Sequence, residues 1–501
     1  MIKRIGLLVC LYCGIYSFAC GMVTDNRNPL VDLCQTILQQ CDEFNYSCMP
    51  LKDVYCVQDY AGEITRNKIT CPVSAQMFLS AMDDVINMLK YNLSDNTTWV
   101  SSNDQDPIPQ PAAIISTLEQ PQQGIYVVAL EAAPTTKVIV TSDYHGNVHA
   151  FIRNLYRYRN AGLMNGDFVL RDDVVLIING DIADRGHYGV ELWAVLFLLM
   201  IQNPHNVILV QGNHEEDSVA QDYGFYAELE AKLFASYDGQ ALRKRIRSHI
   251  LSLWGLLPQA VFVGVRDYKG ILNFAQCNHG GLPGPLLGQS FAPGYDGFCM
   301  LLEKVAEDHR PYKKYAFLQS RVPKRNGLTW NGFFAGAGST TVKQGKRRDD
   351  FLHHGCTVSD YFGRLRSRDV RVSCIVRGHE HLDHGINQLQ DVVPESIDHR
   401  KCCPGWAPFF KKIPLCYGDN SYPVLTITSM AEDFFKDAYV VLSFVPEARV
   451  WIATPCVYES LFAGDRQGDL FLRWKVTYNE STHSFDWSAL VERANAVADD
   501  D

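Results

Sequence analysis

Acidic, amide and imidazole side chains gather in short polar segments whose spacing could support metal chemistry. The segments are Asp-Tyr-His at 143–145, Gly-Asp-Ile-Ala-Asp-Arg-Gly at 180–186, Gly-Asn-His-Glu at 212–215 and Gly-His-Glu-His at 378–381. The first three follow apolar, β-branched runs that are typical of strands, at 137–140, 174–178 and 207–210. Because α/β folds place their chemistry at strand ends, these side chains are candidate ligands of a hydrolytic metal centre.

The mixture of donors suits a pair of metal ions. Two divalent ions held ~3.5–4 Å apart can clamp a phosphate and convert a shared water into hydroxide near neutral pH. One carboxylate must bridge them, and Asp181 is the predicted bridge because it follows the central run, 174–178. Asp143 and His145 alternate along a strand end, so both can face one ion. Asn213 offers a neutral oxygen to the second ion, and such oxygen and nitrogen donors suit Mn, Fe or Zn.

The same order of segments continues downstream. Three more motifs follow the metal-ligand segments: Tyr-Gly-Phe-Tyr at 223–226, Leu-Pro-Gln-Ala-Val at 257–261 and Cys-Asn-His-Gly-Gly-Leu-Pro at 277–283. Together they resemble the phosphoprotein phosphatase family of calcineurin-like metallophosphoesterases, over roughly 137–449. The resemblance implies an α/β (α+β) metallophosphoesterase four-layer fold, in which helices flank a central β-sandwich and a dinuclear metal centre lies at the sheet edge.

The resemblance also implies which residues bind the metals. The ligands of one ion would be Asp143, His145 and Asp181. The ligands of the other would be Asp181, Asn213, His279 and His379. His381 departs from the family, which typically has one histidine in this segment, whereas the broader metallophosphoesterase group uses a second one on the first ion. His381 is therefore either a ligand or a surface histidine. The expected cofactor is two divalent ions, with Mn²⁺ as the first choice and Fe or Zn as alternatives.

Phosphoester hydrolysis also needs a proton for the leaving group and positive charge for the phosphoryl oxygens. In the family, the histidine of Gly-Asn-His-Glu donates the proton and pairs with an aspartate, and these are His214 and Asp184 here. Asp184 could also serve as the N-cap of the following helix. Arg185 offers a planar, charged fork that binds two phosphate oxygens. Asn213 is expected to contact the phosphate as well.

A second arginine usually faces the first in the family. Gly355 resembles a family glycine that lies at a fixed spacing from this second arginine. Counting back from Gly355 gives Arg348 as the candidate, with the neighbouring Arg347 as the alternative. The alternative is that 345–348 forms a solvated basic loop. The family's Ser-Ala-Pro-Asn-Tyr loop is absent, since 428–433 reads Thr-Ser-Met-Ala-Glu-Asp. A preference for phosphoserine and phosphothreonine or for phosphotyrosine therefore stays open.

The expected function is a phosphoprotein phosphatase that hydrolyses phosphomonoesters on Ser, Thr or Tyr by direct attack of a metal-bridging hydroxide. Its partner would be a phosphorylated protein or peptide. Two alternatives are a small-molecule phosphohydrolase, such as a dinucleoside polyphosphatase or nucleotidase, and a catalytically inert binding module. The net charge of -10 argues against nucleic acid as a partner, because phosphate backbones need a positive surface.

The N-terminal part of the sequence indicates export. Residues 1–21 resemble a secretory signal peptide, with a basic start, an apolar core and small residues at the end, although a buried helix is the alternative. The apolar stretch is too short for a transmembrane anchor. Cysteines crowd the region 22–100, and an oxidising compartment would pair most of them as disulfides. Secretion is expected, with delivery into a host cell or a cytosolic location as alternatives.

The remaining organisation follows from composition. Within the cysteine-rich region 22–100, residues 75–93 show helical apolar spacing. A Pro- and Gln-rich linker is expected at 101–123. The catalytic domain would span 124–457, with an insertion near 390–420, and 458–501 would form a C-terminal extension.

Overall fold

The computed structural model describes most of the catalytic region and part of the N-terminal region. The described residues are 28–41, 71–100, 110–120, 124–234, 240–283, 295–320, 327–334, 342–345, 350–381, 385–390, 406–408, 412–416, 421–429, 436–459, 477–479 and 484–486. The predicted signal peptide, 1–21, lies outside them, as do Arg347 and Arg348.

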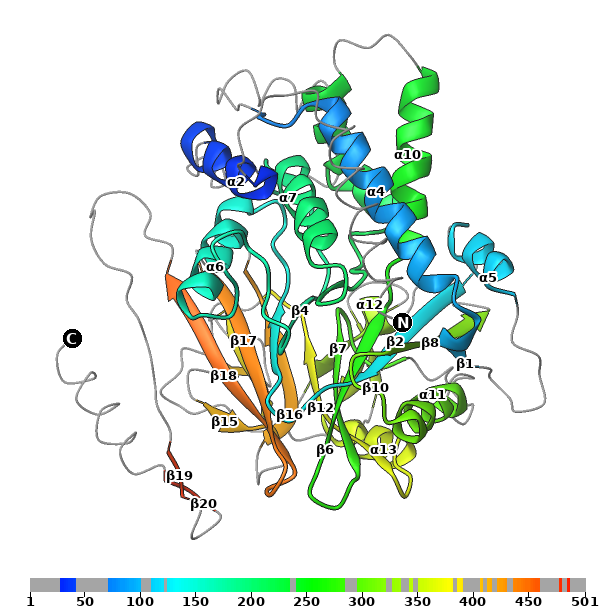
Figure 1. The fold of residues 1–501 in the computed structure, drawn as a ribbon, viewed down its shortest axis with the longest axis vertical. Helices are drawn as coiled ribbons and strands as arrows, with labels where there is room; N and C mark the ends of the chain where they lie inside the picture. The colour runs from blue at the N-terminus through cyan, green and yellow to red at the C-terminus, as the bar shows by residue number, and fades with distance from the viewer. Residues whose placement is uncertain are drawn as a thin grey trace, which may run out of the picture.

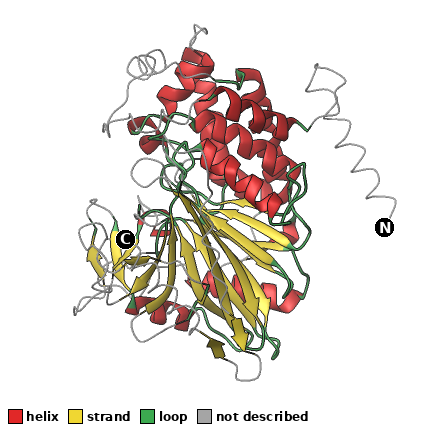
Figure 2. Ribbon diagram, turned by 90° about the vertical axis from the view of Figure 1, so that its left-hand side faces the viewer, coloured by secondary structure: helices red, strands yellow, loops and turns green. Residues whose placement is uncertain are grey.

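Two β-sheets stack at the centre of the molecule (Figures 1 and 2). The nine-stranded sheet has the order β1-β8-β2-β6-β7-β12-β16-β13-β14, and the six-stranded sheet has the order β15-β18-β17-β3-β4-β5. The strands of the first sheet are β1 (Trp99–Val100), β2 (Gly124–Glu131), β6 (Ala260–Arg266), β7 (Leu272–Asn278), β8 (Lys314–Ser320), β12 (Val370–Arg377), β13 (Ile386–Gln390), β14 (Trp406–Pro408) and β16 (Ser421–Ile427). The strands of the second are β3 (Lys137–Thr141), β4 (Val174–Ile178), β5 (Val207–Leu209), β15 (Ile413–Pro414), β17 (Lys436–Val445) and β18 (Val450–Glu459).

The strands predicted at 137–140, 174–178 and 207–210 are present as β3, β4 and β5, and they are parallel neighbours. Their apolar side chains are buried on both faces of the sheet, as expected for a parallel sheet between two layers. Parallel strands end at the same edge of a sheet. The polar segments that follow β3, β4 and β5 therefore emerge side by side.

Helices complete the layers. Their bounds are α2 (Pro29–Gln40), α4 (Ala75–Leu93), α5 (Pro111–Leu118), α6 (Val148–Asn160), α7 (Gly189–Gln202), α8 (Asp217–Asp222), α9 (Phe225–Leu229), α10 (Gln240–Gly255), α11 (Tyr295–Asp308), α12 (Gly327–Trp330) and α13 (Cys356–Arg364). Short elements are the 3-10 helix η2 (Asn96–Thr98), the π-helix η3 (Glu230–Phe234), a small sheet of β9 (Gly332–Phe334), β10 (Val342–Gln344) and β11 (Phe351–His354), and the pair β19 (Thr477–Asn479) and β20 (Ser484–Asp486).

Apolar side chains form a core in each space between layers. The inner core joins the facing sheets, with Val138 and Ile177 on one side and Val263 on the other. α6 and α7 pack on the outer face of the six-stranded sheet, and α11 and α13 pack on the outer face of the nine-stranded sheet. This arrangement confirms the predicted four-layer α/β fold.

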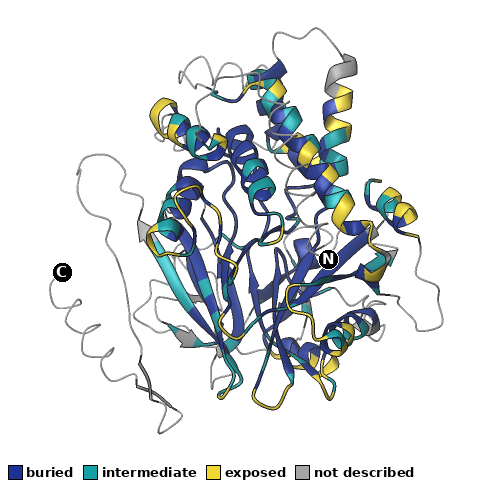
Figure 3. Ribbon diagram, in the orientation of Figure 1, coloured by how far each residue is buried: buried dark blue, intermediate teal, exposed yellow. Residues whose placement is uncertain are grey.

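The N-terminal helices belong to the same core as the catalytic region. Helix α4 has the bounds of the predicted helix at 75–93, and both α2 and α4 contact α7. The rings of Phe78 and Phe197 meet edge to face, with their centroids 5.4 Å apart. With the sheet on one side and these helices on the other, α7 is buried along nearly its whole length (Figure 3).

Two segments contain regular elements that the sequence analysis did not predict. The expected linker, 101–123, contains helix α5, because Pro111 favours a first helical turn and Ile114 and Leu118 find an apolar surface to bury against. The expected insertion near 390–420 contributes β14 to one sheet and β15 to the other. Edge pairing of this kind depends on distant strands and leaves little local signal.

Of the cysteines predicted to pair, Cys34 and Cys71 form no disulfide in the described part of the chain. Cys48 and Cys56 lie outside the described residues. Among the helices that are described, none combines the length and the apolar character that crossing a membrane requires.

Candidate metal centre

The loop after β3 carries the first pair of polar side chains. Asp143 and His145 are buried, and both adopt a left-handed backbone, with φ of 53° and 44°. Tyr144 points away from them, because its hydroxyl lies 2.6 Å from Thr141 Oγ1 and its ring packs edge to face on Phe151. Left-handed backbone at residues other than glycine costs about 1–3 kcal/mol each and clusters at functional sites.

The loop after β4 places Asp181 between two groups of imidazoles. Its Oδ2 lies 3.4 Å from His145 Nε2 on one side and 3.2 Å from His279 Nε2 on the other. Gly180 has φ of 77°, and a Cβ there would collide with the backbone nitrogen of Gly212. The close backbone contact between these loops fixes Asp181 at the centre of the site.

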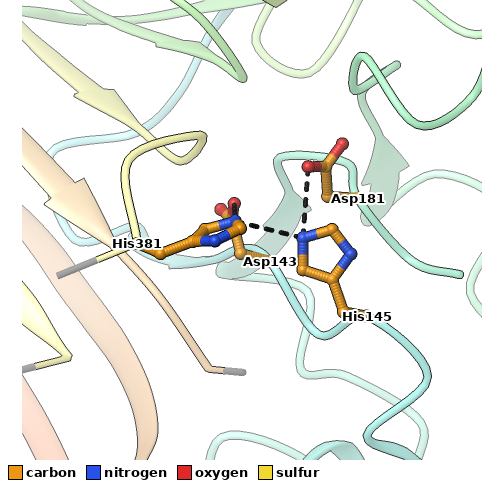
Figure 4. Close-up of side chains that lie close together, drawn as sticks. All are labelled: Asp143, His145, Asp181 and His381. Atoms are coloured by element: carbon orange, nitrogen blue, oxygen red, sulfur yellow. Dashed lines mark hydrogen bonds and ion pairs between the residues drawn. The ribbon is translucent and has the colours of Figure 1, made fainter. Parts of the chain in front are cut away.

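On one side of Asp181, Asp143, His145 and His381 complete a group of possible ligands (Figure 4). One donor atom from each of the four residues lies within 4.8 Å of all the others. His381 Nε2 lies 3.2 Å from His145 Nε2 and 3.6 Å from Asp143 Oδ1. The ring of His381 therefore faces the group of ligands, and 20% of its side-chain surface stays exposed.

On the other side, Asn213 joins two histidines. Its Oδ1 lies 2.9 Å from His279 Nε2 and 2.9 Å from His379 Nδ1. His279 follows β7 and His379 follows β12, which are parallel neighbours. The structure thus brings all of the predicted metal ligands together around Asp181.

Backbone carbonyls orient two of the rings. His145 Nδ1 lies 3.1 Å from the carbonyl oxygen of Ala183, and His279 Nδ1 lies 2.7 Å from that of Asn179. An Nδ1–H that donates to a carbonyl leaves the Nε2 lone pair free, and this is the usual arrangement of a metal-binding histidine. The Nε2 lone pairs of His145 and His279 therefore face Asp181.

The charges around Asp181 favour a bound cation. Burial alone would raise the pKa of Asp181, but the imidazoles, His279 first, hold it well below its usual range. Burial alone would lower the pKa of His279, but Asp181 and Asp143 raise it to about 9. The carboxylates thus stabilise positive charge at His279 Nε2, where a metal ion would bind, and the donor set fits divalent metals.

Beside this group lie the residues predicted to act on the phosphate and the leaving group. His214 Nδ1 is 2.7 Å from Asp184 Oδ2, and Arg185 Nη2 is 3.3 Å from His214 Nε2. Burial raises the pKa of Asp184 well above its usual range, against the effect of the Phe225 amide, which donates to its Oδ1 at 2.9 Å. Asp184 does not cap the following helix, because α7 begins at Gly189 and its N-cap residue is Tyr188.

Arg185 has further neighbours. Its Nη1 lies 2.8 Å from His381 Nδ1, and its guanidinium carbon is 5.6 Å from the centre of the Tyr223 ring. The predicted second arginine, Arg348, and its rival Arg347 lie outside the described residues.

Two contributors to the site are absent from the predicted set. Glu215 accepts backbone N–H bonds from Asp181 at 2.9 Å, Ile182 at 3.0 Å and Gly212 at 2.8 Å, so it ties two loops together. Burial, with Asp181 nearby, raises the pKa of Glu215 to about 7. Trp330 lies against His379, with ring centroids 6.2 Å apart. Glu215 is part of the Gly-Asn-His-Glu motif, whereas no local signal marks Trp330.

Comparisons with known proteins agree with this geometry. Residues 136–383 match the calcineurin-like phosphoesterase family model. The chain is 29% identical over 176 residues to serine/threonine-protein phosphatase T of Saccharomyces cerevisiae, covering 33% of each protein. It is 30% identical over 138 residues to the serine/threonine-protein phosphatase 6 catalytic subunit of Caenorhabditis elegans, covering 27% of this chain and 37% of that one. The chain thus spans about a third of the length of these relatives.

Among solved structures, a protein serine/threonine phosphatase from Saccharomyces cerevisiae aligns over 81% of this chain and 98% of its own, with 15% identity and a TM-score of 0.43. The family assignment rests on the sequence match, which covers the strands β3, β4 and β5 and every segment that converges on Asp181. Over residues 136–383 the chain thus belongs to the calcineurin-like phosphoesterase family, and the curated relatives that it resembles are serine/threonine-protein phosphatases.

Proposed function

We propose that the chain is a metal-dependent protein phosphatase that hydrolyses phosphomonoesters of serine, threonine or tyrosine in a phosphorylated protein or peptide. The observation that carries this proposal is the position of Asp181, which lies within 3.4 Å of His145 and within 3.2 Å of His279, at the junction of two ligand groups. A carboxylate in that position can bridge two ions. The names of the curated relatives, which are serine/threonine-protein phosphatases, support the substrate class.

The first ion would be held by Asp143, His145, Asp181 and His381. The second would be held by Asp181, Asn213, His279 and His379. When bound, the two ions would supply Lewis acidity and lower the pKa of water toward neutrality. Mn²⁺ is our first choice, with Fe or Zn as alternatives, because mixed imidazole, carboxylate and amide ligands suit these borderline metals.

The other residues would act on the phosphate and on the leaving group. Arg185 would present a charged fork to two phosphoryl oxygens, and Asn213, whose Oδ1 lies 2.9 Å from His279 Nε2, is the other proposed phosphate contact. His214, oriented through Nδ1 by Asp184 at 2.7 Å, presents Nε2 toward the site and would protonate the departing oxygen. Arg348 remains our candidate for a second phosphate contact.

Chelation tests the proposal directly. Treatment with a chelator should abolish hydrolysis of phosphoserine, phosphothreonine and phosphotyrosine peptides, and added Mn²⁺ should restore it, because the bound ions would supply the Lewis acidity that the reaction needs. The measurement is phosphate release, with Zn²⁺ and Fe²⁺ added in parallel. A nucleotide and dinucleoside polyphosphate panel is the comparison. If the protein hydrolysed only nucleotides, it would be a small-molecule phosphohydrolase and not a protein phosphatase. If it bound metal but hydrolysed nothing, it would be a catalytically inert binding module.

His381→Ala tests the extra histidine. We expect the protein to bind one ion tightly and the other at least about tenfold more weakly, because one of the four ligands of the first site is lost. Metal content after dialysis, measured by plasma emission spectroscopy, gives the result. If His381 instead only orients Arg185, to which it lies 2.8 Å away, the variant would keep two ions and lose affinity for phosphate.

A further inference from the structure

A buried ion cluster lies behind the loop that carries Arg185. Lys232, in the π-helix η3, lies between Glu191 of α7 and Glu228 of α9. Its Nζ donates to Glu191 Oε2 at 2.7 Å and to Glu228 Oε1 at 3.0 Å. The three side chains are at most 2% exposed. A buried ion pair contributes little net stability compared with apolar residues, but it is strongly destabilising to remove one partner, so the cluster holds α7, α9 and η3 in one arrangement.

The cluster contacts the backbone at the end of the loop. Lys232 Nζ donates to the carbonyl oxygen of His187, and Glu228 Oε1 accepts the backbone N–H of Val190 at 3.0 Å. The N-cap of α7, Tyr188, forms no side-chain cap bond. Glu228 therefore provides the acceptor that the first turn of α7 lacks, where helix polarity also favours a negative charge.

The loop itself needs such support. Asp184 and Arg185 are consecutive residues with left-handed backbone, at φ of 69° and 65°. Backbone of this kind persists when the surrounding structure holds it in place. The side chain of Asp184 is fixed by the Phe225 amide and by His214, so the start of the loop is anchored. The bond from Lys232 to His187 anchors its end.

We propose that Lys232 is a positioning residue for phosphate binding: by holding His187 against Glu191 and Glu228, it keeps Arg185 aimed at the phosphate. The inference rests on the proposed function, because it takes Arg185 as the phosphate ligand. Lys232 itself does not contact the substrate. Its effect on the site is transmitted through the backbone of residues 185–187.

The test compares Lys232→Met and Lys232→Arg with the wild-type full chain loaded with Mn²⁺. Calorimetry with inorganic phosphate should show at least about tenfold weaker binding in Lys232→Met, the scale of one lost charge-assisted hydrogen bond. With p-nitrophenyl phosphate, KM should rise more than kcat falls. Lys232→Arg keeps a donor to the same acceptors and should recover phosphate affinity to within about threefold, while bound metal stays at the wild-type level in both variants.

Arg266→Met is the matched control, because it breaks an ion pair with Glu131 on a distant strand, at 2.8 Å. It should lower the melting temperature without changing phosphate affinity. Equal weakening in Arg266→Met would assign the effect to general destabilisation and overturn the inference. If Lys232→Met does not fold, Glu191→Gln preserves size and removes one charge of the cluster, and it should weaken phosphate binding at least about threefold.

A folded Lys232→Met or Glu191→Gln variant with normal metal content and wild-type phosphate affinity would also overturn the inference. The proposed function can fail separately. If the wild-type protein binds metal and phosphate but hydrolyses no phosphoester, the phosphatase proposal is lost, while the comparison of phosphate affinities still decides the role of Lys232.

Discussion

Asp181→Asn should lower the turnover of an aryl phosphate by at least about 10³-fold, which corresponds to a loss of about 4 kcal/mol of transition-state stabilisation. The carboxylate lies between His145 and His279 and is the one group that both ligand sets share. An amide has one neutral oxygen where the carboxylate has two that share a negative charge. The variant should therefore bind fewer than two ions per chain, and steady-state kinetics with metal analysis would measure both effects.

The control for this substitution is Asp267→Asn. Asp267 is also buried, but it pairs with Arg371 at 3.5 Å at the opposite ends of β7 and β12 from the metal centre. It should reduce stability and keep both ions. Retention of two tightly bound ions and near-wild-type turnover in Asp181→Asn would show that Asp181 does not bridge metals.

His214→Ala should lower turnover by roughly 10²–10⁴-fold when the leaving group is a poor one, such as the alkoxide of phosphoserine. The imidazole is held by Asp184 with Nε2 toward the site, so it can protonate the departing oxygen. A nitrophenolate leaving group needs little protonation, and its hydrolysis should fall much less. The measurement is the ratio of kcat values for the two substrates in variant and wild type.

A buried histidine outside the site serves as the control. His149→Ala removes an imidazole whose Nε2 lies 3.0 Å from the carbonyl oxygen of Cys41, in the contact between α6 and the N-terminal region. It should affect both substrates equally. Turnover of phosphoserine peptide above a tenth of wild type in His214→Ala would remove the proposed acid role.

Much of the fold and of the metal centre was predictable because both have strong local signals. The runs that form β3, β4 and β5 are mostly apolar and rich in β-branched residues, and each is followed by a motif whose residue types and spacing are typical of metal ligands. Parallel pairing then brings Asp143, Asp181 and Asn213 to one edge. Family resemblance added His279, which lies in a glycine-rich turn and carries no distinctive signal of its own.

The parts that were not predicted depend on long-range contacts. Glu215 accepts backbone N–H groups from two separate loops, and Lys232 links α7 with η3 across about forty residues of sequence. Neither contact follows from residue type or spacing. The prolines around helix α5 suggest extended chain, although Pro111 occupies the first helical turn, where proline is well tolerated.

The burial of α7 has a practical consequence for producing this protein. Its faces away from the sheet are covered by α2 and α4, which lie up to about 160 residues earlier in the sequence. A fragment that began at β2 would lack α2 and α4 and would expose the apolar side chains of α7 that they cover, such as Phe197, which packs on Phe78 of α4, and exposed apolar area of this kind drives self-association. Expression boundaries chosen from the family match alone would thus give a product prone to self-association, and a useful fragment starts no later than Asn28, the N-cap of α2.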